Sequence, residues 1–411
     1  MVSKIFKSLI IAATDNVTLQ VHLLGGIPFV DIGVTILLWS VLSLYLAGDL
    51  YWIYEMVRYG IFYSPPSRHY DEGDAQVRIL TVNNEDIVRK TVRELPESFH
   101  KPYVISEEPI EIAKAHVYVV PGEFESDATN KARAMEWARQ SIPCEREFVL
   151  YLDEDSHIIE FNGLPNADII QLNEFPRRTS SLLTYLCEIN RIGFQVEQTA
   201  FPRIKTPLYA WGGGIAIRKS VEDKITWDYP TVIEDTVFMW RAFTELDQNV
   251  SFAYIPDRVS NQAPPNIWEM FNQRRRWIAG SREDNDILSV DRVLMYGIRD
   301  LSWSVTGLIP MIVVIGLLPG INIFFGNLYR TASLILLSFM YMWIIIGILR
   351  YRPSIPIVIA VLILAPLTTI LHSIGALWGL ITPPDTFEVT EKVKEKPEKD
   401  EHSEKVSNES H

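Results

Sequence analysis

Four long stretches of this chain contain no Asp, Glu, Lys or Arg, and this absence constrains the fold more than any other feature. A helix of about 20 apolar residues is long enough to cross the hydrocarbon core of a bilayer. One such stretch could be a buried core helix, but three in succession near the carboxyl end favour a membrane protein. We expect one spanning helix before the central region and about three after it. The stretches are residues 32–48, 301–329, 331–349 and 353–382.

The basic residues near these stretches indicate how the chain is oriented. Arginines between positions 274 and 299 favour a cytoplasmic side for the central region. Arg350 and Arg352 agree with that orientation, whereas Arg330 does not. We therefore expect an integral, multi-pass membrane protein. The expected segments are 1–30, which crosses the membrane or lies along it, 31–62, a transmembrane helix with an interfacial extension, 63–290, a cytoplasmic domain, 291–382, an interfacial helix and about three transmembrane helices, and 383–411, a disordered acidic tail.

The central region alternates short apolar runs with amphipathic ones. The apolar runs have the length of strands, and residues 128–139 between two of them have helical periodicity. Such alternation is typical of an α/β domain built from βαβ units. The apolar runs are residues 77–82, 103–106, 116–120 and 148–152.

Charge and cysteine content exclude several classes of protein. The formal net charge of −13 argues against a nucleic-acid-binding protein, and the acidic tail contributes part of it. Cys144 and Cys187 are the only cysteines, which gives no support to a disulfide framework or a thiolate metal site.

Two aspartates follow the last apolar run of the α/β region. Asp153 and Asp155 come at the carboxyl end of the buried-strand pattern 148–152, where open α/β sheets bind ligands. Strand alternation points both side chains the same way. Aligned carboxylates suit a divalent metal, either Mg²⁺ or Mn²⁺. An isolated Asp-x-Asp is more often a solvated turn, but the buried strand and the clusters that follow favour a metal site.

A second acidic pair, Glu234 and Asp235, precedes residues 237–246, which have helical periodicity. One interpretation is that Asp235 caps this helix. The other is that Asp235 is a general base that removes the proton from a hydroxyl group.

Three consecutive glycines follow Trp211 and precede a short apolar run. Glycines such as Gly213 permit close approach of the backbone to a ligand, although a plain turn would have the same pattern. We regard Trp211 and Gly213 as candidate ligand contacts.

The third cluster contains Gln273, three adjacent arginines that end at Arg276, and Trp277. A positive flank of a membrane span explains the arginines but not Gln273 or Trp277. Guanidinium groups match the oxygens of a diphosphate, and an indole ring can stack on the face of a sugar. The cluster therefore indicates a binding site for a diphosphate and a sugar.

In this order the three clusters resemble the signature of family 2 glycosyltransferases with a GT-A fold, which is Asp-x-Asp, Glu-Asp and Gln-x-x-Arg-Trp. Within that family the chain most resembles the egghead-type β-1,4-mannosyltransferases. The similarity covers most of the central domain and the flanking membrane spans. It runs through residues 119–121, 131–134, 152–154, 211–213, 234–235, 239–243 and 273–280.

The resemblance implies an inverting transfer of a sugar, mannose from GDP-mannose as the first candidate, to a lipid-linked or glycolipid acceptor. It implies that Asp155 binds the metal, with Asp153 near the nucleotide, and that Asp235 is the base. Many family members have an Asp pair after the second strand, where this chain has Ser106-Glu107-Glu108. The other residues assigned through this resemblance and by position are Asn84, Glu85 and Glu107 at the nucleotide, Lys131, Gln273 and Arg276 at the diphosphate, Glu234 beside the base, and Trp277, Trp211 and Gly213 at the acceptor.

Two alternatives differ in function. Processive synthases of the cellulose and hyaluronan type have similar signatures, but the small number of spans here favours the addition of one or a few sugars. A catalytically inactive membrane scaffold could keep the same fold, although the intact clusters argue against it. A transporter is disfavoured because the spans contain almost no ionisable residue except His372.

Overall fold

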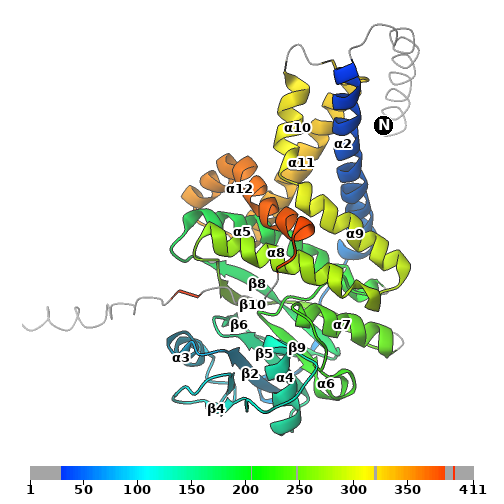
Figure 1. The fold of residues 1–411 in the computed structure, drawn as a ribbon. Helices are drawn as coiled ribbons and strands as arrows, with labels where there is room; N and C mark the ends of the chain where they lie inside the picture. Colours follow the sequence, from blue (N-terminus) through cyan, green and yellow to red (C-terminus); the bar gives the residue numbers. More distant parts are fainter. Residues whose placement is uncertain (1–28, 205, 247–248, 319–321, 385–391, 394–411) are drawn as a thin grey trace, which may run out of the picture.

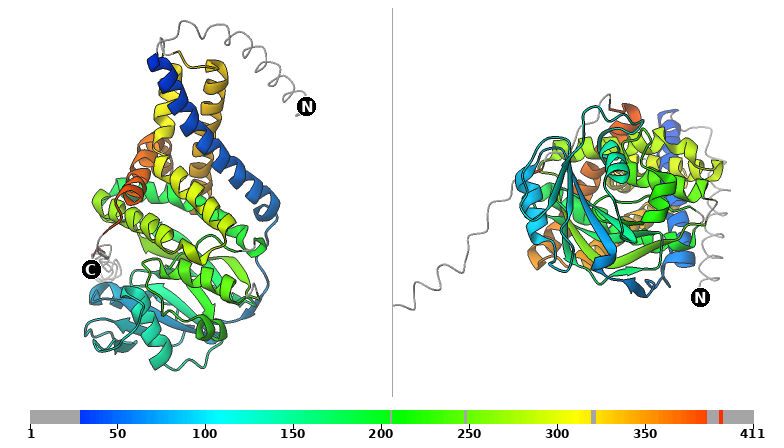
Figure 2. Two further views of the ribbon diagram at one scale, coloured as in Figure 1. Left: turned by 45° about the vertical axis from the view of Figure 1, so that its right-hand side comes forward. Right: turned by 90° about the horizontal axis from the view of Figure 1, so that it is seen from below.

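The computed structural model describes residues 29–384 apart from 205, 247–248 and 319–321, together with residues 392 and 393. A bundle of helices stands on a sheet domain (Figure 1), and the two further views in Figure 2 show the same arrangement. The expectations for residues 1–28 and for most of the segment 383–411 lie outside the described residues.

The sheet domain confirms the predicted α/β class. Its eight strands have the order β4-β3-β2-β5-β9-β8-β10-β6, and a separate pair joins β1 to β7. The strands β2 to β5 are parallel to one another, whereas β9 runs antiparallel to both of its neighbours. The strands are β1 (Arg68–Tyr70), β2 (Ala75–Thr81), β3 (Tyr103–Ser106), β4 (His116–Val119), β5 (Phe148–Asp153), β6 (His157–Glu160), β7 (Leu164–Pro165), β8 (Ile169–Arg177), β9 (Ile215–Arg218) and β10 (Phe252–Gln262).

Apolar side chains on both faces of the central strands hold this sheet. One core cluster joins β5 and β9 to the helices α4 and α7, with Trp137 and Trp240 among its members. The other packs β2, β5 and β8 against α3. Because β5 is buried on both faces, only its carboxyl end reaches a cavity. The helices of this domain are α3 (Glu85–Glu94), α4 (Asn130–Ser141), α6 (Lys219–Ile225) and α7 (Glu234–Glu245).

A layer of helices lies between the sheet and the bundle. The helices α5 and α8 cover the sheet, and α12 packs across both of them (Figure 1). The packing is close, because a Cβ at Gly375 would lie 2.6 Å from the carbonyl oxygen of Phe271 in α8. The helices of the layer and bundle are α2 (Phe29–Glu55), α5 (Leu182–Phe194), α8 (Ile267–Glu283), α9 (Val290–Val305), α10 (Leu308–Leu317), α11 (Gly326–Tyr351) and α12 (Ile355–Ile381).

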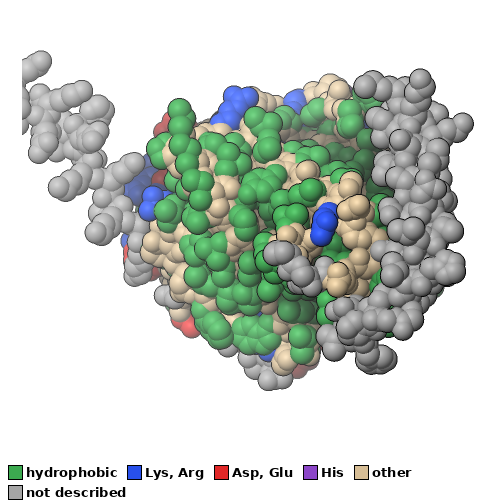
Figure 3. Space-filling view, turned by 90° about the horizontal axis from the view of Figure 1, so that it is seen from above, with side chains coloured by type: hydrophobic (Ala, Val, Ile, Leu, Met, Phe, Trp, Pro, Cys, Tyr) green, Lys and Arg blue, Asp and Glu red, His purple; other side chains and the backbone are tan. Residues whose placement is uncertain are grey.

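Three helices in the described part of the chain are long and apolar enough to cross a membrane, and the bent pair α9 and α10 would make a fourth. The bend of 64° divides the uncharged stretch 301–329, which the sequence presents as one run. Side chains on the far end of the bundle are largely hydrophobic (Figure 3). These features agree with a membrane-embedded bundle, whereas the number of crossings and the orientation stay predictions.

Candidate active site

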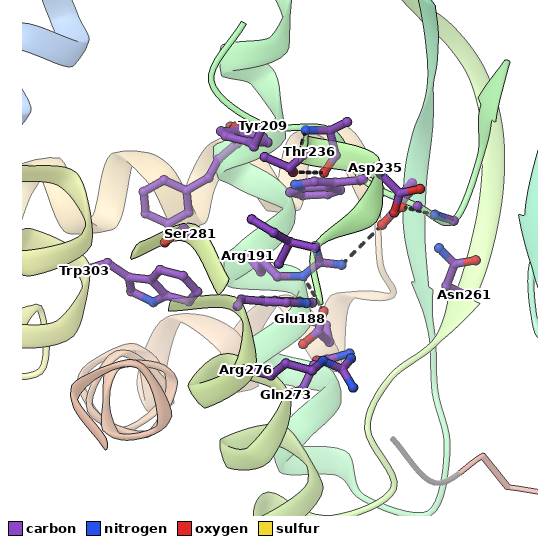
Figure 4. Close-up of a pocket in the computed structure, with 18 of the residues that line it drawn as sticks. Glu188, Arg191, Tyr209, Asp235, Thr236, Asn261, Gln273, Arg276, Ser281 and Trp303 are labelled. Atoms are coloured by element: carbon purple, nitrogen blue, oxygen red, sulfur yellow. Dashed lines mark hydrogen bonds and ion pairs between the residues drawn. The ribbon is translucent and has the colours of Figure 1, made fainter. Parts of the chain in front are cut away.

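Residues from all three sequence clusters line one cavity of about 820 Å³, but Asp155, the expected metal ligand, is not among them. The carboxyl end of β5, the starts of α4 and α7, and one face of α8 line it. Figure 4 labels Asp235 of α7 and Gln273 and Arg276 of α8. The parallel strands β2 and β5 end at this edge, which is why residues distant in sequence converge there. The predicted residues that line the cavity are Glu107, Lys131, Asp153, Trp211, Gly213, Glu234, Asp235, Gln273, Arg276 and Trp277.

Lys131 joins the acidic clusters electrostatically. Its Nζ lies 2.9 Å from Asp153 Oδ1, 2.9 Å from Glu234 Oε1 and 3.6 Å from Asp235 Oδ2. Burial alone would lower the pKa of Lys131, but the three carboxylates raise it well above its usual value. Lys131 therefore stays charged and offsets part of the negative charge of the site.

Asp235 is a strongly perturbed carboxylate of the cavity. Its pKa is raised to about 7, chiefly by burial and also by Glu234 and Asp153, while Lys131 acts in the opposite direction. Oδ1 of Asp235 has no hydrogen-bond partner among the described residues. The side chain thus has an unused acceptor atom and a pKa near neutrality, which suits a general base.

This pKa predicts the pH dependence of activity. A base must be unprotonated, so we expect kcat/KM to rise with pH and to level off above a midpoint of about 7. Replacing Lys131 with Met removes the group that lowers the pKa of Asp235, so the midpoint should move to higher pH. A pH profile of nucleoside diphosphate release measures both. An unchanged midpoint in Lys131→Met would contradict the assigned coupling.

The glycines after Trp211 leave room for the acidic groups. A Cβ on Gly212 would overlap Oδ2 of Asp235 and lie 2.8 Å from Lys131 Nζ. A Cβ on Gly213 would overlap the amide of Asn261 and lie 2.7 Å from Glu174 Oε1. The close approach predicted for this loop is therefore made to side chains of the chain itself.

Substitution of Gly212 should displace the base. We expect Gly212→Ala to lower kcat by roughly 10²-fold, the scale of a displacement of about 1 Å at a reacting group. Gly297→Ala is the matched control, because a Cβ there meets nothing within 4 Å. Steady-state rates of both variants test this, and a Gly212→Ala enzyme as active as the control would contradict the geometry.

The arginine cluster divides into three environments. Arg274 is fully buried and pairs with Glu188, away from solvent. Arg275 donates to the carbonyl oxygens of Thr382 and Pro383, at 2.9 and 3.0 Å. Only Arg276 of the three lines the cavity, together with Gln273 and Trp277. Of the three guanidinium groups in this cluster, that of Arg276 is therefore the one at the cavity.

Arg191, which belongs to none of the sequence motifs, lies between Trp211 and Trp277. The guanidinium carbon of Arg191 is 4.1 Å from the ring centre of Trp211 and 5.5 Å from that of Trp277. Arg191 also pairs with Glu188 at 2.6 Å and with Glu174 at 3.5 Å (Figure 4). These contacts fix both rings at the cavity wall. No sequence signal identified Arg191, Glu188 or Glu174, since all three come from segments without a motif.

The side chains of the expected nucleotide loop contact other residues of the chain. Asn84 donates to Glu154 Oε1 at 2.6 Å, and Thr81 donates to Glu154 Oε2 at 2.5 Å. Neither Asn84 nor Glu85 is among the residues that line the cavity, and Glu85 contacts Arg89 instead. Glu154 does line the cavity. The Asp-x-Asp pattern singles out only its two neighbours, so the pattern gave no reason to expect Glu154 there.

Asp153 and Asp155 form ion pairs with different lysines, Lys131 and Lys392 respectively. Strand β5 ends at Asp153 and a turn follows, so strand alternation does not extend to Asp155. Oδ1 of Asp155 is 2.7 Å from Lys392 Nζ, and its Oδ2 accepts from the backbone N–H of Gln262 at 2.6 Å. Burial raises the pKa of Asp153, but Lys131 and Lys392 outweigh that effect and lower it.

A divalent metal fits this pair of carboxylates by donor type. Carboxylate oxygens are the ligands that Mg²⁺ and Mn²⁺ accept. Asp153 lines the cavity, whereas Asp155 is fully buried and pairs with Lys392. The described residues contain no group of three or more His, Cys, Asp or Glu that could enclose an ion alone. Phosphate oxygens and water would have to supply the remaining ligands, as is common for Mg²⁺ at phosphate sites.

Fold and site together define an enzyme that transfers a sugar from a nucleotide donor, with the GT-A fold. The sequence profile described as glycosyl transferase family group 2 matches residues 148–377, which is more than half of the chain. The chain therefore belongs to the family 2 glycosyltransferases.

Two solved structures resemble the chain at low identity. One is the mannosyltransferase PcManGT from Pyrobaculum calidifontis in complex with GDP-Man and Mn²⁺, with a TM-score of 0.49 and 11% identity over 85% of this chain and 98% of that chain. The other is residues 1–349 of S. aureus TarS in complex with UDP. It has a TM-score of 0.31 and 15% identity over 67% of this chain and 89% of that chain. No curated protein sequence matches the chain.

Proposed function

We propose that this chain is a membrane-bound, inverting glycosyltransferase that moves a sugar from a nucleotide-diphosphate donor to a lipid-linked or glycolipid acceptor. One observation carries the proposal. The unpartnered oxygen of Asp235, the ammonium of Lys131 and the guanidinium side of Arg276 belong to one cavity that continues from the sheet into the helical bundle.

The residues divide the chemistry between them. Asp235 accepts the proton of an acceptor hydroxyl while the oxygen of that hydroxyl forms a bond to the anomeric carbon of the donor sugar. The bond from that carbon to the diphosphate breaks, and its electron pair leaves with the nucleoside diphosphate. Lys131 and Arg276 offset the charge that develops on this leaving group. Attack opposite to the leaving group inverts the anomeric configuration.

A divalent metal held by Asp155, with Asp153 close by, would neutralise further charge on the diphosphate. Glu107 lines the donor end of the cavity and pairs with Arg133 at 3.0 Å. Gln273 lies on the same face of α8 as Arg276, and its amide oxygen accepts a hydrogen bond from Arg274.

The inner part of the cavity supports an acceptor that stays in the bilayer. Its walls there come from α2, α9 and α11, three helices of the bundle. Tryptophan rings can stack on sugar faces, and hydroxyl and carboxylate groups can bind sugar hydroxyls. A glycolipid could thus bring its sugar to Asp235 without leaving the membrane. The lining residues of this part include Tyr45, Asp49, Trp52, Ser302, Trp303 and Trp343.

Mannose from GDP-mannose is the first candidate donor sugar, on the strength of the resemblance of residues 211–213 and 239–243 to the egghead-type enzymes. The catalytic domain is proposed to face the cytoplasm, because Arg275, Arg282 and Arg350 lie where the bundle meets the sheet domain.

Product analysis tests the proposed reaction. The detergent-purified protein is incubated with radiolabelled GDP-mannose, Mn²⁺ and a membrane lipid extract, and the label is followed into the organic phase. We expect one labelled glycolipid that is longer than its acceptor by one or a few sugars. A ladder of long polymer would instead support a processive synthase, and label that stays in the aqueous phase would contradict a lipid acceptor.

A further inference from the structure

A buried carboxylate at the cavity, Glu174, has no role in the proposed chemistry. Glu174 lies on β8, is only 5% exposed and lines the cavity. A charged group at this depth is costly unless hydrogen bonds and countercharges compensate it. The partners of its two carboxylate oxygens therefore indicate what the side chain does.

One of these oxygens holds the glycine loop, which we define as residues 211–214. Oε1 of Glu174 accepts the backbone N–H of Gly213 at 3.0 Å. A second side chain of β8, Gln171, holds both ends of the loop through one backbone N–H and two carbonyl oxygens, at 2.8, 2.9 and 3.0 Å. Glu174 thus supplies the contact at the middle of the loop.

The middle of the glycine loop is also where it meets the proposed base. Gly212 packs so closely on Asp235 that a Cβ on this glycine would overlap Oδ2. The residue before the loop is joined to the same helix, because the N–H of Ala210 donates to Thr236 Oγ1 at 3.1 Å. A displaced Gly213 would carry Gly212 with it and would change the position that Asp235 can adopt.

The glycine loop also contacts the donor end of the cavity. Asn261, on β10, lies against Gly213, where a Cβ would overlap the amide nitrogen of Asn261. Oδ1 of Asn261 accepts from the hydroxyl of Ser156 at 2.7 Å, and the same hydroxyl oxygen accepts the backbone N–H of Asp153 at 3.1 Å. The loop is thus connected to the carboxyl end of β5, where the donor is proposed to bind.

The other oxygen of Glu174 reaches the proposed acceptor wall. Oε2 lies 3.5 Å from Nη2 of Arg191, whose guanidinium lies between the rings of Trp211 and Trp277. Arg191 has a closer countercharge in Glu188, at 2.6 Å. Replacement of Glu174 therefore leaves this arginine paired, so we expect it to change the position of the loop and the rings more than the stability of the fold.

We propose that Glu174 is a positioning residue of the transfer reaction, which holds the glycine loop against the proposed base and steadies the arginine beside the acceptor rings. It acts through Gly213 and Arg191 and needs no contact of its own with a substrate. This inference rests on the proposed function, because it takes Asp235 as the base. It adds a residue that aligns the base and the acceptor wall together.

Two variants of Glu174 test this role. Glu174→Leu removes both contacts, whereas Glu174→Gln keeps an oxygen that can accept the N–H of Gly213. We expect Glu174→Leu to lower kcat by roughly 10²-fold, the scale of a displacement of about 1 Å at a reacting group. The Kd of a labelled donor should stay unchanged, because Lys131 and Arg276 are not altered. Glu174→Gln should recover most of kcat.

Steady-state release of nucleoside diphosphate and equilibrium binding of the labelled donor, both on the full-length, detergent-purified protein, measure the two quantities. Asp168→Asn is the matched control. Asp168 directly precedes β8, toward the other end of the strand from Glu174, and pairs with Arg218 at 2.9 Å. This control should keep the kcat of the wild type.

The possible failures can be told apart. If Asp235→Asn loses turnover but Glu174→Leu has the kcat of the wild type, the positioning role is wrong and the proposed function stands. A parallel loss of kcat and donor affinity in both Glu174 variants would show a purely structural residue and would also overturn the inference. If Asp235→Asn keeps its turnover, the proposed function fails, and this inference fails with it.

Discussion

Asp235→Asn should lower turnover by about 10²- to 10⁴-fold, the usual contribution of a general base. The amide keeps the size of the side chain but cannot accept the proton of the acceptor hydroxyl. Because Lys131, Asp153 and Arg276 remain, donor binding should change much less than turnover. Release of nucleoside diphosphate measures the first quantity, and equilibrium binding of a labelled donor measures the second.

The control for this variant is Asp223→Asn. Asp223 lies on α6, its side chain is 51% exposed, and its pair with Lys219 is a surface contact of little energetic value. The Asp223→Asn variant should therefore have unchanged turnover. An Asp235→Asn enzyme with the activity of this control would remove Asp235 from the mechanism.

Glu188→Gln should cause the largest loss of stability, about 3–5 kcal/mol, because it leaves the fully buried Arg274 without its countercharge. Arg191 loses a partner as well, so the rings of Trp211 and Trp277 should be held less firmly. The midpoint of thermal unfolding in detergent measures the effect. Donor affinity should fall with it.

The lowered pKa of Glu188 predicts that the stability of the protein depends on pH. Burial raises the pKa of Glu188, but Arg274 and Arg191 outweigh it and lower the pKa from 4.5 to about 2. A lowered folded-state pKa stabilises the folded protein above about pH 4.5, and that contribution is lost as the pH falls toward 2. As the pH falls from about 4.5 toward 2, the Glu188→Gln variant should therefore lose less stability than the wild type.

Glu245→Gln provides the comparison for Glu188→Gln. Glu245 pairs with Arg241 on the surface of α7 and is 47% exposed, so its replacement should cost less than about 0.5 kcal/mol. Equal unfolding midpoints for the two variants would show that the buried cluster does not support the helical layer.

Local patterns were sufficient to predict where several candidate site residues stand in the fold. The strand at 148–153 is apolar throughout and ends in acids, which places Asp153 at the edge of a sheet without knowledge of the rest of the chain. The signature residues Glu234, Asp235 and Arg276 likewise stand at helix positions that their own segments determine. Their convergence on one cavity follows from the parallel order of β2 and β5.

Contacts between residues that are distant in the chain could not be predicted from the sequence. Lys392 lies in a charged segment whose composition is typical of a solvated tail, so its contact with Asp155 could not be predicted. The bend between α9 and α10 was missed because hydropathy is uniform through it and records no direction. Asn84 was expected at the nucleotide, but its amide is used by Glu154.

The most direct test of the account is nucleoside diphosphate release by the detergent-purified protein against a panel of GDP-, UDP- and dTDP-sugars. Each donor is tested with and without Mn²⁺ or Mg²⁺, in the presence of membrane lipid extract. We expect metal-dependent turnover of one donor, with GDP-mannose as the first candidate, and loss of that turnover in Asp235→Asn. Absence of both turnover and donor binding across the whole panel would contradict a sugar-transferring enzyme and favour an inactive membrane scaffold.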